Sequence, residues 1–348
     1  MASAQLRFWL DPALKAKELD AMRRSNSEWD FMGRTFFVLA LAEISERDSS
    51  TKVENLAVID SIIDETLALE ARHSMHFFLM PYSKWNSYRV EPARSLFVDG
   101  EIALMLATRR AVAEKPAYKE LFATRAKLIE ERLNNPLVIA ESYPNECWLF
   151  DHALALAALR IGDYLDGTDH HALSAKWTAV AKDKLTHAKS GLLVSSYMTD
   201  TRWLDGPEGS SIWGAAHFLR FIDEDLARAQ YENARREIGR TLLGFGWSRE
   251  WPVTWSNHSD IDSGAVIPVV NASAGASGMA LVAAASFGDK IFYRSLKTSL
   301  NFAAFPVRNH GALRYSASNA VGDAALLYAE TLGAIHAKVT KPRPAGKM

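Results

Sequence analysis

The sequence predicts an all-α protein, an (α/α)6 toroid with short extended hairpins at one mouth. Helical periodicity runs through most of the 348 residues. The candidate helices come in pairs that repeat every roughly 50 to 65 residues. Within a pair one helix is rich in Ala, Gly and Leu, whereas the other is amphipathic, as in residues 118–132 and 225–240. Small-residue helices suit a tightly packed inner ring, and half-polar helices suit an outer ring.

The elements follow in order along the chain. Periodic apolar positions predict helices over 12–24, 28–47, 52–77, 92–113, 117–133, 146–165 and 172–189. After an extended segment over 192–198, helices are expected over 210–222, 225–243, 273–287, 291–304 and 319–337. The segments 246–255 and 307–315 predict extended loops or hairpins at one mouth of the toroid. Loops of this length in a compact domain usually serve a site.

The domain organisation expected is a single barrel domain over residues 1–338. We find no linker, low-complexity tract or convincing boundary inside it. The end of the chain, 339–348, contains the sequence Lys-Pro-Arg-Pro-Ala-Gly-Lys-Met and is expected to be a flexible basic tail.

Composition narrows the function classes. A hydrophobic content of 48% is typical of a globular core, and a formal net charge of -1 argues against nucleic acid as a partner. A single cysteine excludes an intramolecular disulfide and a cysteine-based zinc cluster. No apolar run approaches the length of a membrane span, so we expect a cytoplasmic protein with a small-molecule substrate and no membrane insertion. The GxGxxG, Walker A, HExxH and GxSxG motifs are missing, which predicts chemistry without a cofactor or a metal.

The segment 141–152 is the strongest candidate for chemistry. Asn145 is a good N-cap and Glu146 suits the positive end of a helix dipole. Cys147 and Asp151 lie four residues apart, so they are expected to share the buried face of an apolar helix. An ionisable pair at a buried helix start is where pKa values are tuned for catalysis. The alternative is a capped core helix with an inert thiol.

Two earlier segments carry further candidates. Asp30 and Arg34 lie one helical turn apart, although Asp30 also follows Ser27 at capping-box spacing. Asp99 and Glu101 interrupt an apolar run, where a charge needs a partner or shifts its pKa toward the neutral form. We expect at least one of these two to be catalytic or to bind substrate, against the alternative of a structural ion pair.

The late loops offer candidates for substrate contact. Trp251 and Trp255 suit stacking against a ligand. His258 and Asp260, followed by Asp262, alternate as on an extended segment, and capping or polar substrate contact is favoured over a metal because no second ligand cluster accompanies them. His310 lies in the other hairpin.

Residues 29–47, 96–106 and 143–170 resemble the linalool dehydratase/isomerase family, and residues 206–285 do so more weakly. The resemblance implies an (α/α)6 barrel that adds or removes water across an allylic alcohol and isomerises it without an organic cofactor. It also implies a homo-oligomer, because family members assemble as rings.

The resemblance transfers to particular positions. Asp30 looks like the family's aspartate, Phe36 falls where the family has a tyrosine, and Glu101 falls at the family's histidine. Tyr143 looks like the entry to a two-cysteine segment. The family's cysteines fall near Asn145 or Glu146 and at Asp151, and Cys147 aligns clearly with neither. Carboxylates in place of thiol and imidazole suggest a more polar or cationic substrate.

Our first hypothesis is therefore a cofactor-independent lyase or isomerase. Asp30, Glu101 and Asp151 would crowd together at the mouth, so that repulsion and burial keep one acid protonated while another acts as base. Cys147 would assist them. The expected substrate contacts are Arg34, Phe36, Asp99, Tyr143, Asn145, Glu146, Trp251, Trp255, His258, Asp260 and His310.

Two other functions remain open. A carbohydrate-active enzyme, either a glycoside hydrolase or a sugar epimerase, would use two inner carboxylates as acid and base and the late tryptophans as stacking platforms. A non-catalytic helical scaffold would present the mouth to a partner.

Overall fold

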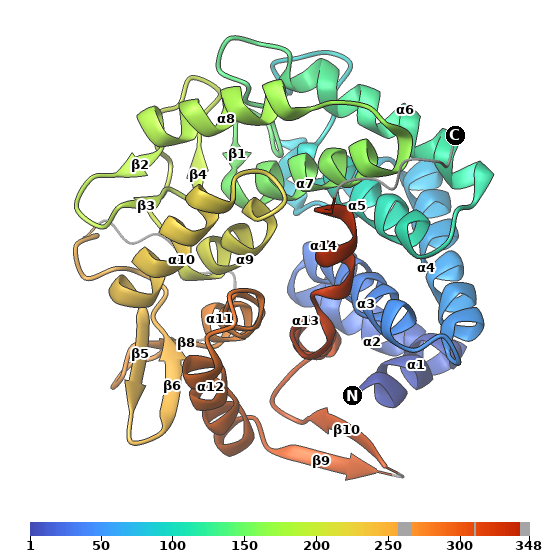
Figure 1. The fold of residues 1–348 in the computed structure, drawn as a ribbon, viewed down its shortest axis with the longest axis vertical. Coiled ribbons are helices and arrows are strands. Elements are labelled where there is room, and N and C mark those ends of the chain that lie inside the picture. The colour runs from blue at the N-terminus through green and yellow to red at the C-terminus, as the bar shows by residue number, and fades with distance from the viewer. Residues whose placement is uncertain (257–265, 310, 342–348) are drawn as a thin grey trace.

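Six helices form a closed inner ring in the computed structural model, which describes residues 1–256, 266–309 and 311–341 (Figure 1). Each helix packs against the next, and the last packs against the first. They are α3 (Ser27–Arg47), α5 (Leu96–Val112), α7 (Leu149–Asp166), α9 (Gly209–Leu219), α11 (Ala274–Ser286) and α13 (Ala320–Thr331). The fold class predicted from the sequence is confirmed.

An outer layer of helices surrounds this ring and alternates with it along the chain (Figure 1). The outer helices are α2 (Pro12–Ser25), α4 (Lys52–His73), α6 (Pro116–Leu133), α8 (His171–Lys184), α10 (Glu224–Glu237) and α12 (Lys290–Ala303). Helix α1 (Ala2–Leu10), which packs against α2, was not predicted from the sequence. Two 3-10 turns, η1 (Met75–Phe77) and η2 (Pro81–Lys84), lie between α4 and α5.

Short strands complete the structure. Strand β1 (Cys147–Trp148) pairs with β4 (Ser196–Tyr197), and β2 (Thr186–His187) pairs with β3 (Leu192–Leu193). A four-stranded sheet has the order β5 (Gly239–Leu242), β6 (Phe245–Ser248), β8 (Ala272–Ser273) and β7 (Val266–Ile267). The last pair is the hairpin of β9 (Pro306–Asn309) and β10 (Ala312–Tyr315).

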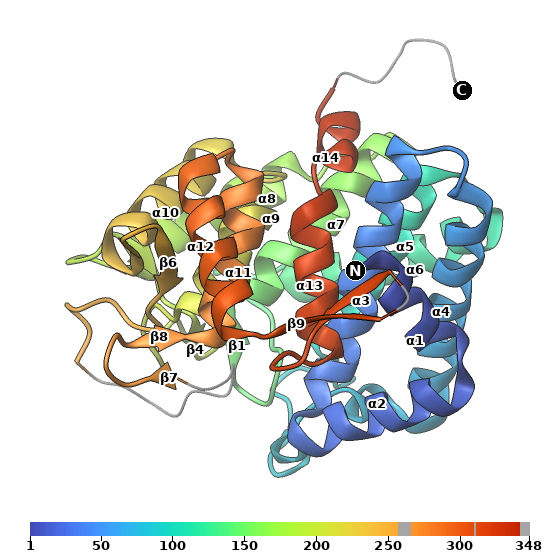
Figure 2. The same cartoon turned by 90° about the horizontal axis from the view of Figure 1, so that it is seen from below.

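The two ends of the ring differ. Strand β1 leads directly into α7, whereas α14 (Ala334–Val339) follows α13, so they lie at opposite ends (Figure 2). We call the end where the inner helices begin the N-terminal mouth. At the other end α14 lies over the centre of the ring (Figure 1). Its start is held by Glu43, whose carboxylate accepts hydrogen bonds from the backbone N–H groups of Ala334 at 2.6 Å and Ile335 at 3.2 Å.

Close packing of the inner ring depends on small side chains. A Cβ atom at Gly100 of α5 would lie 3.0 Å from the Cβ of Ala155 on α7. These two helices therefore approach closely at the level of the acidic residues described below. This is the packing that an inner ring rich in Ala and Gly was expected to allow.

Several element boundaries differ from the prediction. Helix α10 ends at Glu237 and the chain continues as β5, where a helix to residue 243 was expected. In 246–255 only the part up to Ser248 is a strand. The hairpin over 307–315 forms, but it lies at the periphery of the ring, where β10 packs against α1 (Figure 1). Val339, expected to begin the tail, is the last residue of α14, and residues 342–348 lie outside the described chain.

Among the described residues, none of the helices combines the length and the apolar character needed to cross a bilayer.

Candidate active site

Two buried carboxyl groups lie on neighbouring inner helices near the N-terminal mouth. Glu101 is in α5 and is 1% exposed, and Asp151 is in the first turn of α7 and is 6% exposed. Both are close in sequence to the tight Gly100–Ala155 contact between the two helices. The charge of Asp151 acts on Glu101 strongly enough to raise the pKa of Glu101. The structure therefore brings these two predicted catalytic residues into one electrostatic environment.

Glu101 has one oxygen engaged and one without a partner. The Thr35 hydroxyl donates to Oε2 at 2.5 Å, while the buried Oε1 accepts no hydrogen bond from residues 1–256, 266–309 or 311–341. Burial raises the pKa of Glu101 well above its ordinary value, and the charges of Asp151 and Glu28 raise it further against the lowering effect of Thr35. The surroundings of Glu101 therefore favour its neutral form.

The pKa of Asp151 lies near neutral pH. Burial raises its pKa to about 7, with the Ser142 hydroxyl opposing this and the charge of Glu146 adding to it. Near pH 7 it is divided between its acid and carboxylate forms. One protonated acid beside a group that ionises near neutral pH can donate a proton at one position and accept a proton at another.

Aromatic and acidic side chains form a rim beside this pair. The Tyr143 hydroxyl donates to Glu28, and the Tyr143 ring stacks on Tyr82 with centroids 4.5 Å apart. Tyr82 in turn donates to Glu146 at 3.2 Å, and the Trp148 indole N–H donates to the same Glu146 oxygen at 2.5 Å. Hydrogen bonding and stacking thus link the predicted residues Tyr143 and Glu146.

The local prediction for Asn145 and Cys147 is wrong. Helix α7 begins at Leu149 with Trp148 at its N-cap, and Asn145 adopts a left-handed backbone with φ 57°. Cys147 lies in β1, where it faces Tyr197 across the strand pair, so it shares no helical face with Asp151. Burial raises the pKa of the Cys147 thiol, and nearby carboxylates raise it further, which keeps it a neutral thiol.

Asp30 and Arg34 lie on another face of α3. The Arg34 Nε donates to Asp30 at 2.7 Å, and Arg23 adds a contact at 3.4 Å. Helical positions advance by about 100° per residue, so Glu28 and Thr35 share a direction that Asp30 does not. The expected three-acid cluster is therefore an acid pair, and Asp30 is held in an ion pair.

Asp99 and Phe36 also lie apart from the acid pair. Asp99 forms ion pairs with Arg94 and Arg125, which also bind Glu70. Arg94, Arg125 and Glu70 line a pocket of about 430 Å³ between α4 and α6, on the outer layer. The alternative of a structural ion pair holds for Asp99. Phe36 is buried, with its ring centroid 6.0 Å from that of Tyr328 on α13.

The two late tryptophans predicted to contact substrate, Trp251 and Trp255, differ in exposure. Trp251 is 7% exposed, so little of its ring is open for stacking. Trp255 is more exposed and lies against Gly206 and the ring of His187, with centroids 5.4 Å apart. His258, Asp260, Asp262 and His310 lie outside the described residues.

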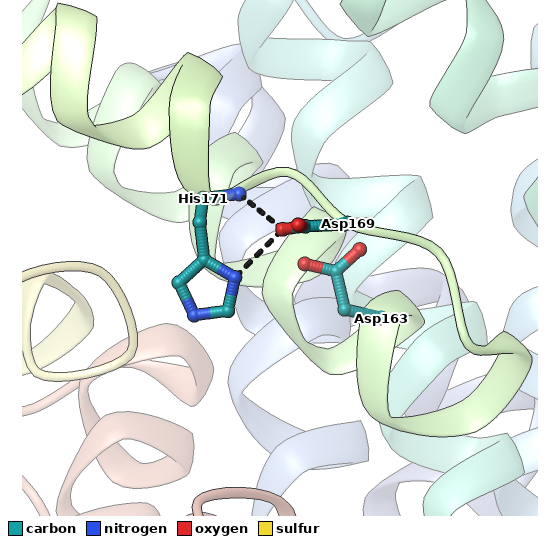
Figure 3. Close-up of side chains that lie close together, drawn as sticks. All are labelled: Asp163, Asp169 and His171. Carbon is teal, nitrogen blue, oxygen red and sulfur yellow. Dashed lines mark hydrogen bonds and ion pairs between the residues drawn. The ribbon is translucent and has the colours of Figure 1, made fainter.

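A third acidic group lies far from the mouth, at the turn into α8. Figure 3 shows Asp163, Asp169 and His171 with ligand atoms close enough to surround an ion. The ligand atoms of these residues already have partners within the protein. Asp169 accepts from His171 Nδ1 at 2.7 Å, and Asp163 forms an ion pair with Arg160. A guanidinium in this position opposes cation binding, so we interpret the group as the cap of α8.

Four residues near the acid pair were not predicted from the sequence: Glu28, Thr35, Tyr82 and Trp148. For the first two a signal existed, because their spacing of seven residues places them on one face of a helix. Tyr82 and Trp148 reach the site through 3-10 and strand segments whose positions depend on contacts distant in sequence, so local patterns carried no signal for them.

Comparisons with known proteins agree with this architecture. A family model described as linalool dehydratase/isomerase matches residues 124–321, more than half of the chain. The match includes 143–170, one of the three segments where the resemblance is clearest, and 206–285, but it does not reach the other two, 29–47 and 96–106. No curated protein matches the chain by sequence.

Three solved structures with a similar fold are described as glycoside hydrolases. A family 105 glycoside hydrolase from C. acetobutylicum ATCC 824 superimposes with a TM-score of 0.56 at 12% identity, covering 91% of this chain and 97% of that chain. A GH76 α-mannanase from Bacteroides thetaiotaomicron gives 0.52 at 10% identity, covering 86% and 85%. A possible GH105 member from Salmonella enterica gives 0.50 at 11% identity, covering 86% and 82%. At these identities the likeness shows the fold alone.

Proposed function

Because this chain belongs to the linalool dehydratase/isomerase family, we propose that it is a lyase or isomerase that moves protons and water on a small substrate. The observation that carries the proposal is the acid pair of Glu101 and Asp151, two buried carboxyl groups on adjacent inner helices with raised pKa values. In this proposal no organic cofactor takes part, since the pair itself supplies both an acid and a base.

The proposed reaction begins with proton donation by Glu101. Thr35 donates to Oε2, so the acidic proton of Glu101 belongs on Oε1, the oxygen without a protein partner. That proton passes to the leaving hydroxyl of an allylic alcohol, the C–O bond breaks, and water departs. Glu101 is then a carboxylate, and the hydrogen bond from the Thr35 hydroxyl still stabilises it.

In the second half of the reaction Asp151 acts as the base. Its ionised form takes a proton from the carbon next to the cation, and the C–H electron pair becomes the new double bond. One turnover therefore moves a proton from Glu101 to the departing water and another from carbon to Asp151. Proton exchange between the two acids restores the starting state, and the reverse path adds water.

The test is turnover in variants of the acid pair. Glu101→Gln and Asp151→Asn preserve shape but remove the acid and the base, so each is expected to lower water elimination from linalool by about 10²–10⁴-fold. Glu43→Gln is the matched control, because Glu43 is a buried carboxyl with a raised pKa at the opposite end of the ring. Hydrocarbon product is measured by gas chromatography.

The result that contradicts the proposal is equally clear. If wild type eliminates water and both acid-pair variants do so at the wild-type rate, the assignment fails. Wild type that acts on none of a series of allylic alcohols, from apolar to cationic, also counts against it. Loss of turnover in Glu43→Gln to the same extent would point to a general loss of structure.

A second candidate is a carbohydrate-active enzyme, in which the same acid pair would serve as acid and base of glycoside cleavage or epimerisation. The half-buried rings of Tyr82 and Trp148, which both donate to Glu146, favour it, since aromatic faces and carboxylates together suit sugar rings. Release of reducing sugar from a panel of oligosaccharides, without action on any alcohol, would favour this candidate over the first.

A further inference from the structure

The pocket of about 430 Å³ between α4 and α6 lies in the outer layer of the ring, and we call it the outer pocket (Figure 1). Both helices pack against α5, and Leu106 of α5 lines the pocket from the inner ring. Small-molecule sites commonly have volumes of roughly 300–1,000 Å³. The residues that line the outer pocket include no member of the acid pair or the aromatic rim, so it is a separate place.

Part of the outer pocket is apolar, although it belongs to the outer layer. Its apolar lining consists of Leu67, Ala71, Met75, Leu106, Leu121 and Leu128. Leu121 and Leu128 lie two helical turns apart on one face of α6, and Leu121 is 41% exposed. Exposed positions elsewhere on α6 carry charges, at Lys119, Glu120, Lys127 and Glu130. Apolar surface left in contact with water costs free energy that an apolar ligand would recover.

The other part of the outer pocket is charged but balanced. Arg94 and Arg125 each form ion pairs with both Glu70 and Asp99, so two cations meet two anions. Burial opposes the charge on Glu70, but the two arginines outweigh this effect and lower the pKa of Glu70. Burial lowers the pKa of His76, which also lines the pocket, and so favours its neutral form. A ligand therefore meets a polar end without a formal charge to neutralise.

The two guanidinium groups keep hydrogen-bond donors in reserve. Arg94 donates from Nε to Asp99 at 3.0 Å and from Nη2 to Glu70 at 3.2 Å, and Arg125 donates from Nη1 and Nη2 to Glu70 at 2.9 and 2.6 Å. Within the described part of the chain, nothing accepts from Nη1 of Arg94 or from Nε of Arg125. Their side chains are 24% and 12% exposed. The polar end of the pocket thus offers donors to an acceptor oxygen.

We propose that the outer pocket binds a small neutral alcohol. The hydroxyl oxygen accepts from Nη1 of Arg94 or from Nε of Arg125, and the hydroxyl hydrogen donates to Glu70. The carbon skeleton covers Leu121 and Leu128. Since the pocket is separate from the acid pair, this binding does not depend on the reaction proposed above.

The balance of charges selects the neutral ligand. A carboxylate of the same size would lie beside Glu70 and Asp99, and an ammonium group would lie beside Arg94 and Arg125. Each would add a charge without a partner to a cluster whose charges already cancel. A hydroxyl group both donates and accepts, so it matches a cluster that contains both kinds of group.

The test compares three probes with the same carbon chain: hexan-1-ol, hexanoate and hexylammonium. NMR of the full chain with isotope-labelled methionine methyl groups reports binding at Met75, which lines the pocket, and Met75→Leu identifies its resonance. Hexan-1-ol is expected to shift this resonance in a saturable way. The two charged probes should bind at least about tenfold more weakly, because each brings a charge that the pocket does not neutralise.

Variants that fill the outer pocket locate the binding. Ala71→Trp on α4 and Leu128→Trp on α6 add bulk from two different helices, so each is expected to abolish the shift, and circular dichroism identifies the variants that fold. Leu10→Trp is the matched control, because Leu10 is 67% exposed on α1 and does not line the pocket. Glu101→Gln should also keep the shift, which separates failure of this proposal from failure of the proposed reaction.

Three observations contradict the proposal. The first is that hexan-1-ol produces no saturable shift at Met75. The second is that the folded tryptophan variants bind hexan-1-ol as wild type does. The third is that hexanoate or hexylammonium binds more tightly than hexan-1-ol, which would make the pocket a site for a charged ligand.

Discussion

Thr35 gives the two oxygens of Glu101 different roles. With Oε2 accepting the Thr35 hydroxyl, only Oε1 remains to carry a proton toward a ligand. At Asp151 the Ser142 hydroxyl plays the corresponding part, and burial raises the pKa to about 7, whereas burial raises the pKa of Glu101 well above its ordinary value. In the proposed mechanism these two environments divide the carboxyl groups into an acid and a base.

The raised pKa of Asp151 predicts a pH dependence of stability. The folded value of about 7 lies above the ordinary 3.8, so the folded chain binds this proton more tightly than the unfolded chain. The stabilisation is complete below about pH 4 and is lost as pH rises through 7. In Asp151→Asn this loss is absent, so the variant should gain stability relative to wild type by up to roughly 4 kcal/mol across that window.

Urea unfolding of both proteins at a series of pH values from 4 to 8 measures this difference. Two curves that stay parallel over the window would show that Asp151 titrates at the same pH in the folded and unfolded chains.

At the scale of elements, small residues decide how closely the helices approach. A Cβ at Gly209, the first residue of α9, would lie 2.6 Å from the backbone oxygen of Arg249 and 2.9 Å from the Cβ of Ala276. Gly209→Ala is therefore expected to destabilise the protein by about 1–3 kcal/mol, because backbone and neighbouring helix must shift.

Gly278 on α11 provides the matched comparison, since a Cβ there meets nothing within 4 Å. Gly278→Ala should stabilise by up to about 1 kcal/mol through helix propensity. Thermal unfolding of the two variants checks both signs, and equal shifts in melting temperature would contradict the packing argument.

The prediction of elements from sequence succeeded where the signal is local. Helical periodicity identified both layers of the ring, because each helix carries its own apolar stripe. It failed before α7, where Cys147 pairs with Tyr197 of β4 across about fifty residues of chain and Asn145 turns left-handed. A good N-cap residue was present, but a contact between distant segments decided the conformation.

Part of the candidate site could likewise be predicted from local sequence. Glu101 and Asp151 stand in apolar runs, and a charge in such a run indicates a special environment. The prediction for Asp30 fails although its helix is correct, because at about 100° per residue its side chain leaves α3 in a different direction from Glu28 and Thr35 and pairs with Arg34.

At the scale of the whole molecule, repeated helix pairs close into a ring because the last inner helix packs against the first. The outer helices cover this ring, as α4 covers α3 and α6 covers α5, so both layers share one hydrophobic core.

The position of α14, held over the far end of the ring by Glu43, has a kinetic consequence. With α14 over that end, we expect substrate and product to use the N-terminal mouth, where the acid pair lies. Product added to steady-state assays should then inhibit competitively, with an unchanged maximal velocity, because both bind at the same acid pair. A noncompetitive pattern would contradict a shared binding place.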